Sequence, residues 1–324
     1  MTSDKARDRK KKTYALVMFA VMFMGIFVVA GVAGLEGVIR AITGGNQSGP
    51  PLGSAPTPTP APPPLFRRNL TSFADALSLT PSGAARVSFT SDRGLFGSDF
   101  GAFVGQRHTA WTQIYGSPVS AEVRILLPPE GLPLWLHGLS GPAPRPPPAF
   151  TYRNATLIEF FPGQQPWLGI ATNLQPLVAG VRLPGPPAPP YIAGLDPVLD
   201  VLENGSRGSA LDRFGDLARR LPPEARFAGA AASPIQGWDN RSVFGVVSEG
   251  NESYRLQAYL AGGSPNEAGL EALRANATAA GTGLLWGREA GAAGGEEVVR
   301  IEARGNWSQV RAVLSSGGFL LPGE

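Results

Sequence analysis

The sequence predicts an α+β protein in which one transmembrane helix and a proline-rich stalk precede two sheet-plus-helix units. Three observations lead to this fold class. Residues 14–35 contain no charged side chain, proline is dense at 44–64 and 183–190, and the rest of the chain alternates strand-like and helix-like patterns. Such a mixture indicates an α+β sandwich with a sheet on one side and helices on the other. The predicted divisions are a basic tail (1–12), an anchor (13–40), a linker (41–65), a first unit (66–183), a second linker (184–194) and a second unit (195–324).

The anchor is predicted from its length and its lack of charge. As a helix, the 22 residues 14–35 extend about 33 Å at about 1.5 Å per residue, enough to cross a bilayer core of about 30 Å. Six Lys or Arg side chains lie within residues 1–12, so the positive-inside bias predicts a cytoplasmic tail and an extracellular remainder. A cleaved secretory signal is the alternative, but its apolar core usually has about 7–15 residues, which favours a retained signal anchor. Ala30 and Gly34 have the small-xxx-small spacing that lets two membrane helices approach, so the anchor is also a candidate homo-oligomer contact.

Composition excludes several classes of function. Residues 1–12 carry six basic and two acidic side chains, a balance of +4, so the other 22 basic and 23 acidic residues leave the remainder at −1. A nucleic-acid partner is not expected, because the basic excess lies in the tail, where it suits anionic membrane lipid. The chain has no cysteine, which removes disulfides, thiol catalysis and thiolate metal sites. It has no lysine after Lys12, which removes Schiff-base chemistry outside the tail.

The most specific pattern is the placement of asparagine. Eight of the ten asparagines open an Asn-x-Ser/Thr triplet, or sequon, without proline, and all eight follow the predicted anchor. At this Ser and Thr content chance gives about one, so we predict an N-glycosylated cell-surface protein; the alternative is that these residues merely share turns. The lack of cysteine and the use of arginine in place of lysine further indicate an archaeal cell surface. The predicted glycosylation sites are Asn46, Asn69, Asn154, Asn204, Asn240, Asn251, Asn276 and Asn306.

Short periodic segments predict the first unit. Leu70, Phe73 and Leu77 fall on one helical face that ends before Pro81. Segments 86–90 and 123–127 alternate apolar and polar residues, as strands with one solvent-exposed face do. The remaining expectations are a glycine-rich loop (91–105), a proline-rich loop (140–148), a strand (156–161) and a short helix (167–174).

The second unit has clearer patterns. A helical stripe from Leu211 to Leu221 ends at two prolines, and a later pair of strands flanks a hairpin turn that carries Asn251. Segments 73–89 and 214–230 each show the pattern of a helix, a proline that ends it and a strand. Segments 156–174 and 298–316, which close the two units, each show a strand followed by a helix, so we predict a duplicated domain. The other predicted elements are strands at 227–232, 243–247, 254–260, 283–287 and 297–303 and helices at 266–280 and 307–314.

No residue constellation predicts a catalytic, cofactor or metal site. His108 and His137 are 29 residues apart and lack a nucleophile elbow, so surface or hydrogen-bonded roles are expected for them. The spacing of Asp196, Asp200 and Glu203 fits one solvated helix face. The other candidates are Asp92, Asp99 and Glu159 for calcium binding or acid–base chemistry, and Trp111, Trp135, Trp167, Trp238, Trp286 and Trp307 for a binding platform, with Trp307 fitting a core stripe.

These patterns together predict a single-pass membrane glycoprotein with a non-catalytic structural, adhesion or complex-assembly role, and with lipid and other envelope proteins as partners. Two other classes stay open: an anchored hydrolase that uses carboxylates, and an extracytoplasmic ligand-binding module. The classes make different demands on the structure. An enzyme needs carboxylates or a histidine converging in a deep cleft, whereas a scaffold needs a flat apolar patch free of sequons.

Overall fold

The fold is mixed α+β and rich in β-structure. The computed structural model describes residues 66–91, 99–128, 132–141, 150–160, 167–183, 191–232, 234–235, 240–290 and 296–320. The predicted tail, anchor and stalk (1–65) and the glycosylation site Asn46 lie outside these residues. Among the helices described, none has the length and apolar character needed to cross a membrane.

The described residues form six helices and fifteen strands. The helices are α2 (Phe73–Leu79), α3 (Asp99–Tyr115), α4 (Leu195–Glu203), α5 (Ala210–Ala218), α6 (Glu267–Ala279) and α7 (Trp307–Ser316). The strands are β1 (Phe66–Arg67), β2 (Arg86–Ser91), β3 (Val119–Leu126), β4 (Pro133–Leu139), β5 (Phe150–Tyr152), β6 (Ala155–Phe160), β7 (Trp167–Ala171), β8 (Leu174–Gln175), β9 (Leu177–Leu183), β10 (Tyr191–Ile192), β11 (Phe227–Ala232), β12 (Arg241–Gly250), β13 (Ser253–Ala261), β14 (Gly283–Ala290) and β15 (Glu297–Gly305).

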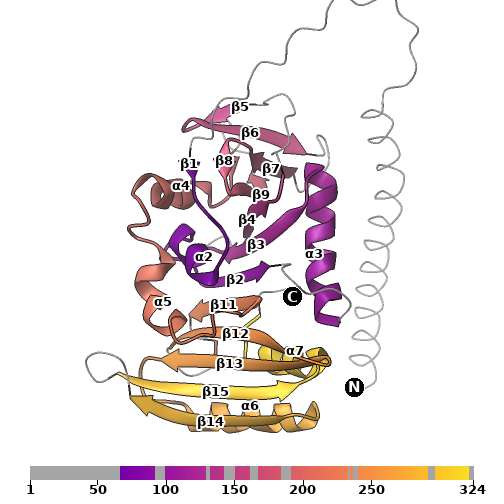
Figure 1. Ribbon diagram of the computed structural model, residues 1–324. Coiled ribbons are helices and arrows are strands. Elements are labelled where there is room, and N and C mark those ends of the chain that lie inside the picture. The colour runs from indigo at the N-terminus through magenta and orange to yellow at the C-terminus, as the bar shows by residue number, and fades with distance from the viewer. Residues whose placement is uncertain are drawn as a thin grey trace, which may run out of the picture. The chain divides into compact units, whose positions relative to one another are not determined.

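One antiparallel sheet runs through almost the whole described chain. Its strand order is β14-β15-β13-β12-β11-β2-β3-β4-β9-β7-β6-β5, with β10 beside β9 (Figure 1). Strands β1 and β8 pair in parallel as a separate two-stranded sheet. Because β14 and β5 end the order, they are the two edges of the main sheet.

Strands β2 and β11 join the two halves of the sheet. They pair antiparallel, with Val87 opposite Ala230 and Phe89 opposite Ala228. The predicted units 66–183 and 195–324 therefore do not form separate sheets in the described part of the chain. Each joining strand follows a helix, α2 before β2 and α5 before β11, as the comparison of 73–89 with 214–230 predicts.

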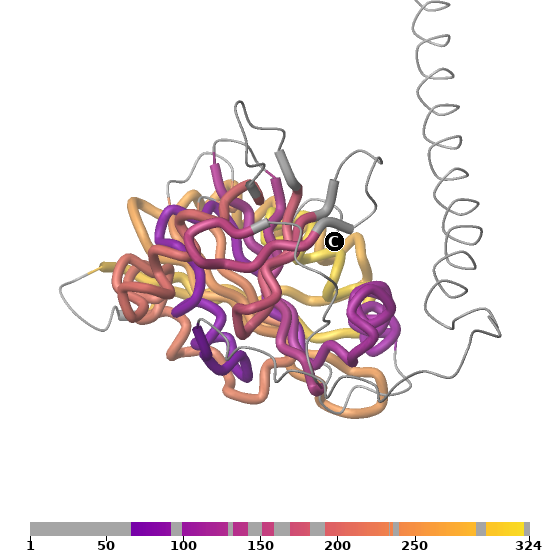
Figure 2. The backbone as a smooth tube through the Cα atoms, turned by 90° about the horizontal axis from the view of Figure 1, so that it is seen from above, coloured from indigo at the N-terminus to yellow at the C-terminus, as the bar shows by residue number. Residues whose placement is uncertain are grey.

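Helices cover both faces of the sheet, not one face as the sequence suggested. Buried residues of α2, α4 and α5 pack with Val87, Phe89 and Val123 on one face. Buried residues of α3, α6 and α7 pack with Phe227 and Phe244 on the other. Figures 1 and 2 show α3 and α4 on opposite sides of the strands. Strands such as β2, buried on both faces, therefore lie in a middle layer.

Local interactions fix several element boundaries. Ser72 and Asp75 form a capping box at the start of α2, and Asn306 and Gln309 form another at the start of α7, each satisfying backbone N–H groups that the first helical turn leaves unpaired. The hairpin from β12 to β13 turns at Asn251, with φ 49°, as predicted. The predicted helices at 211–221, 266–280 and 307–314 and the predicted strands of the second unit are confirmed, with small shifts at their ends.

Two predicted elements of the first unit are wrong. Residues 99–105 begin helix α3 instead of continuing a loop, because Phe100 and Val104 are buried against the apolar cluster beneath α6 and α7. Residues 167–171 form strand β7 instead of a helix, because they pair with β6 on one side and β9 on the other. In both cases contacts between distant segments override the local preference of the segment, for a loop at 99–105 and for a helix at 167–171.

Candidate functional site

A row of polar residues crosses three neighbouring strands on the face that α3 covers. Thr90 of β2 lies opposite Glu122 of β3, and Glu122 lies opposite His137 of β4. All three are buried, with Glu122 at 2% and His137 at 0% relative exposure. The alternation of apolar and polar residues predicts that this strand face is exposed to solvent, which is wrong, because α3 lies over it.

Helix α3 supplies the partners of this row. Arg107 donates to Glu122 Oε1 from Nε at 2.9 Å and also from Nη2. Tyr115 Oη lies 2.8 Å from His137 Nδ1, and His108 Nε2 lies 3.2 Å from Thr90 Oγ1. His137 Nε2 lies 3.4 Å from Glu122 Oε2. We call these six residues the buried polar row: Thr90, Arg107, His108, Tyr115, Glu122 and His137.

Electrostatics set one protonation pattern in the row. Burial alone would raise the pKa of Glu122, but the charge of Arg107 and the contact with His137 outweigh it and lower that pKa to about 2. Burial lowers the pKa of His137, although Glu122 opposes the shift. Burial, and then the charge of Glu122, raise the pKa of Tyr115 well above its usual value. At neutral pH, Tyr115 therefore donates to Nδ1 of a neutral His137, whose Nε2 lies near the Glu122 carboxylate without reaching hydrogen-bond geometry.

Aromatic rings close the row on one side. The ring centroid of Trp111 lies 4.4 Å from that of His137 and 5.3 Å from that of Trp135. Trp111 also stacks on Tyr115, with the ring centroids 5.7 Å apart. Glu122 and His137 are thus enclosed by protein groups. The paired carboxylate fastens α3 to the sheet.

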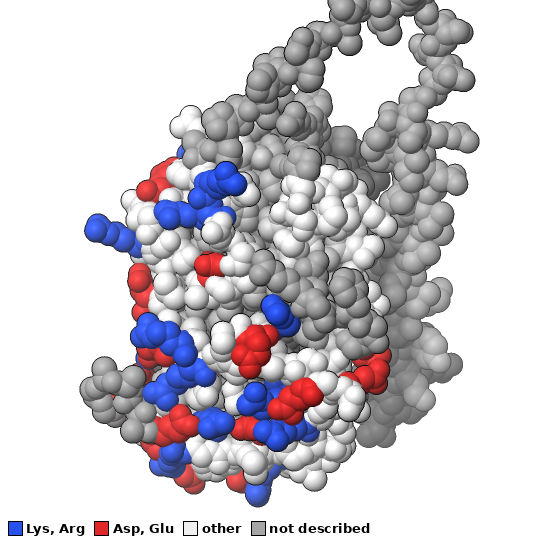
Figure 3. Space-filling view, in the orientation of Figure 1, with Lys and Arg blue, Asp and Glu red and all other residues white. Residues whose placement is uncertain are grey.

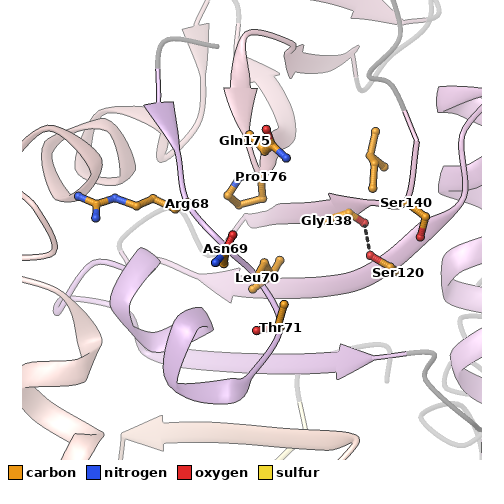
Figure 4. A pocket seen from close by; sticks show the side chains of 10 residues that line it. Arg68, Asn69, Leu70, Thr71, Ser120, Gly138, Ser140, Gln175 and Pro176 are labelled. Atoms are coloured by element: carbon orange, nitrogen blue, oxygen red, sulfur yellow. Dashed lines mark hydrogen bonds between the residues drawn. The ribbon is translucent and has the colours of Figure 1, made fainter. Parts of the chain in front are cut away.

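A separate pocket of about 390 Å³ lies near the start of the described chain (Figure 4). Among the described residues around it, Arg68 is the only charged side chain, and the hydroxyl of Ser120 already donates to the Gly138 carbonyl. Such a lining can hydrogen-bond a polar molecule but offers no carboxylate for acid–base chemistry. Its lining consists of Arg68, Asn69, Leu70, Thr71, Ser120, Gly138, Leu139, Ser140, Gln175 and Pro176.

Comparisons with known proteins do not identify a family. No family model matches the chain, and no curated protein matches it. The fold is similar to crystal form I of TP0453, with 9% sequence identity, 77% of this chain and 100% of that chain covered, and a TM-score of 0.42. Crystal form III of TP0453 gives 9% identity, 76% and 99% coverage and a TM-score of 0.43. At these values the likeness supports no statement about function.

Six of the seven predicted glycosylation sites in the described chain are exposed. Asn154 and Asn251 lie in hairpin turns with positive φ, 64° and 49°. Asn240 is the exception at 4% relative exposure, and Ser242 of the same sequon is fully buried and bonded to the Ala231 carbonyl inside the sheet. The exposed sites are Asn69, Asn154, Asn204, Asn251, Asn276 and Asn306.

The acidic residues of α4 share one exposed face, as predicted, and one arginine binds them all. Arg153 contacts Asp196 at 3.1 Å, Asp200 at 2.7 Å and Glu203 at 2.7 Å. These contacts raise the pKa of Arg153, first through Asp200 and then through Asp196. The cluster ties the β5–β6 hairpin to α4, so its carboxylates have a structural partner.

The remaining candidates are dispersed. Asp92 and Trp238 lie outside the described residues, as do the side chains of Glu159 and Trp167, while Asp99 is exposed in the first turn of α3. Trp307 is a core residue, as predicted, and Trp286 donates to Glu271 at 3.3 Å. No group of three His, Asp or Glu side chains placed to hold a metal occurs in the described part of the chain.

Sequence reasoning missed the pairing of Glu122 with His137. A usable indication was present, because Glu122 stands between the apolar residues Ala121 and Val123 in a strand with few other charges. The sequence does not show which residues pair with Glu122, because only the fold brings the strand of His137 and the helix of Arg107 beside it. Both histidines of the chain belong to this one row, although the sequence placed them on unrelated segments.

Proposed function

We propose that this protein is a membrane-anchored, N-glycosylated cell-surface protein with a non-catalytic role in envelope structure, adhesion or assembly of a membrane complex. In this proposal residues 13–40 hold the chain in the membrane with residues 1–12 in the cytoplasm. The stalk at 41–65 then carries the folded part away from the lipid, since proline-rich segments favour extended conformations.

The observation that carries the proposal is the distribution of the sequons. Six of the seven in the described chain present an exposed asparagine. They occur on hairpin turns, at helix ends, on one helix surface and in the segment between β1 and α2, spread along the sequence from Asn69 to Asn306. Sugars at such positions leave the sheet and its cores undisturbed, because they project from the surface. Asn240 supplies an internal contrast, since a sugar at this buried residue would disrupt the sheet where β12 begins.

A duplicated origin of the two units is part of the proposal. It is supported by the equal order of helix and strand at 73–89 and 214–230, and by the antiparallel pairing of β2 with β11. The closing segments give less support, because 167–171 is a strand whereas Trp307–Ser316 is a helix.

The hydrolase and ligand-binding alternatives draw less support. Glu122, a buried carboxylate whose pKa is lowered to about 2, is enclosed by α3 and is paired with Arg107. The pocket beside Asn69 lacks a carboxylate among its described lining residues. The scaffold class is also only partly met, since Leu211 and Leu285 are the large exposed apolar side chains in the described chain and they do not form a broad patch.

Glycopeptide mass spectrometry of the full chain recovered from native membranes tests the proposal. We expect sugar on most of the exposed sites and none on Asn240. The variant Asn251→Gln should lose the mass of one glycan, while the matched variant Asn240→Gln should keep the mass of the parent glycoprotein. Unmodified asparagines throughout, on a protein recovered from the cytosol, would overturn both the glycosylation and the topology.

A further inference from the structure

The two edges of the main sheet are unlike each other. At one end, β5 has three residues, and the hairpin that follows it carries the sequon Asn154 and is held to α4 by Arg153. At the other end, β14 has eight residues and, among the described strands, pairs only with β15. An unpaired edge of this length presents a row of backbone donors and acceptors that can pair with another strand.

Strand β14 lacks several of the features that usually protect an edge. Its sequence, GLLWGREA, contains neither proline nor lysine, and its pairing with β15 continues from Gly283 to Ala290 without a shift of register. Bulges, prolines and charged side chains, lysine above all, are the common devices that prevent edges from pairing. The charged residues of β14, Arg288 and Glu289, lie near its end and form ion pairs within the chain. In the part of the chain that the structure describes, the edge is therefore regular and pairs with no strand other than β15.

The exposed side chains of β14 suit a close partner. Leu285 is 74% exposed, more than any other large apolar side chain in the described chain. The neighbours on the same strand face are Gly283 and Gly287, and a Cβ added at either would meet no atom within 4 Å. The side chain of a leucine on a strand paired at this edge would thus find open space on the sheet face beside Leu285.

Charge does not oppose the approach of an identical edge. Arg288 of β14 contacts Glu267 of α6 and, at 3.1 Å, Glu297 of β15. On the other face, Glu302 of β15 contacts Arg300 at 2.9 Å and Arg304 at 3.2 Å. Figure 3 shows basic and acidic side chains interspersed over the region of β12 to β15. Two copies with internally balanced charges do not repel each other.

The predicted sugars also leave this edge open. No sequon asparagine lies on β14. Glu267 and Glu271 mark the side of α6 that faces β14, through Arg288 and Trp286 respectively. Asn276 lies nine residues after Glu267, which at about 100° per residue places it half a turn away, on the opposite side of α6.

We propose that β14 pairs antiparallel with β14 of a second copy of this chain, about a two-fold axis at Leu285. This register sets Leu285 opposite Leu285 and Gly283 opposite Gly287, so the interface is the same surface on both copies. A strand from the chain's own linker is a poor occupant, because 8 of the 21 residues at 44–64 are prolines that lack the backbone N–H. The inference goes beyond the proposed function and needs neither the sugars nor the anchor.

Cysteine cross-linking in the full chain tests the pairing, since the natural sequence has no cysteine and gives no background. Directly opposite residues in an antiparallel pair have Cα atoms about 4.5–5.5 Å apart, within the range that a disulfide spans. In native membranes under mild oxidation, Leu285→Cys should form a disulfide-linked dimer, and so should the double variant Gly283→Cys/Gly287→Cys. The matched control Leu211→Cys, on exposed α5, should stay monomeric.

The register and the edge are tested separately. Gly283→Cys alone should not cross-link, because its opposite residue is Gly287. Adding Leu285→Lys to the double cysteine variant should reduce cross-linking at least tenfold without changing the melting temperature. Equal cross-linking of Leu285→Cys and Leu211→Cys would indicate random collision or contact through the anchor alone, and a monomer in every case would also overturn the pairing. Either result leaves the glycopeptide measurement, and thus the proposed function, unaffected.

Discussion

Two regions of the sheet are covered by helices on the same face, but they are held in different ways. Helices α6 and α7 cover β12 to β15 through apolar contacts that include Leu270, Val310 and Leu314, while the charged residues Arg300, Glu302 and Arg304 of β15 lie on the opposite, open face. Helix α3 covers β2 to β4, and its central residues Arg107 and His108 contact Glu122 and Thr90 within the buried polar row. Only its two ends reach apolar clusters, through Phe100 and Tyr115.

The comparison shows two ways to fix a helix on a sheet. Apolar contacts stabilise in proportion to buried area and are insensitive to pH, because no titrating group takes part. Buried charges contribute little net stability but penalise any arrangement that separates them, because an unpaired charge inside protein is costly. The row therefore fixes the position of α3, which has three glycines or alanines in its first seven residues and a weak apolar stripe.

The largest expected effect is that of Glu122→Gln. The substitution removes the negative charge that the Arg107 side chain, 14% exposed, contacts. Breaking one side of a buried pair costs about 3–5 kcal/mol. Thermal unfolding of the full chain in detergent, followed by tryptophan fluorescence, measures the change. In the double variant with Arg107→Gln, the loss should be less than the sum of the two single losses, since the two residues act as a pair.

Acid should weaken the same region. The pKa of Glu122 is about 2 in the folded chain and 4.5 without the fold, so the unfolded chain binds more protons as the pH falls between these values. Stability present above pH 4.5 should thus decrease by about 3 kcal/mol as the pH approaches 2. The lowered pKa of His137 adds a loss of the same sign that begins below pH 6.5. Denaturant unfolding from pH 7 to pH 2.5 should show this slope, and Glu122→Gln should flatten it below pH 4.5.

A truncation in the apolar region should cost somewhat less and be insensitive to acid. Leu314 of α7 is fully buried, so Leu314→Ala creates a cavity and is expected to cost about 2–5 kcal/mol. The matched control Leu211→Ala, at a side chain 36% exposed, should cost less than about 1 kcal/mol. If the loss in Leu314→Ala changed with pH as that in Glu122→Gln does, the distinction between the two regions would fail.

The smallest effect is expected on the open face of the second region. Glu302 contacts Arg300 and Arg304, whose side chains are partly exposed. Exposed ion pairs contribute about 0–1 kcal/mol, so Glu302→Gln should change the unfolding free energy by no more than that. Added salt should reduce this small loss but leave the loss in Glu122→Gln largely unchanged, because salt screens exposed charges more than buried ones.

Much of the fold could be predicted because its evidence is local. Helices α2, α5, α6 and α7 follow apolar residues at helical spacing, and their starts carry capping residues such as Ser72, Asn266 and Asn306. The hairpin at Asn251 follows from a short polar turn between two alternating segments. The acidic face of α4 follows from spacing alone, but its partner Arg153 does not.

The sequence by itself determined which segments alternate, where helices begin and end, and where the eight sequons lie, because each of these depends on residues within about four positions of one another. Tertiary structure alone decided that α3 is a helix, that helices cover both faces of the sheet, and that Glu122 is buried between Arg107 and His137. Those outcomes depend on strand register and on contacts between segments far apart in the chain, such as β2 with β11. Local propensity carries no information about such partners, and the free energy of pairing buried charges exists only once they have met.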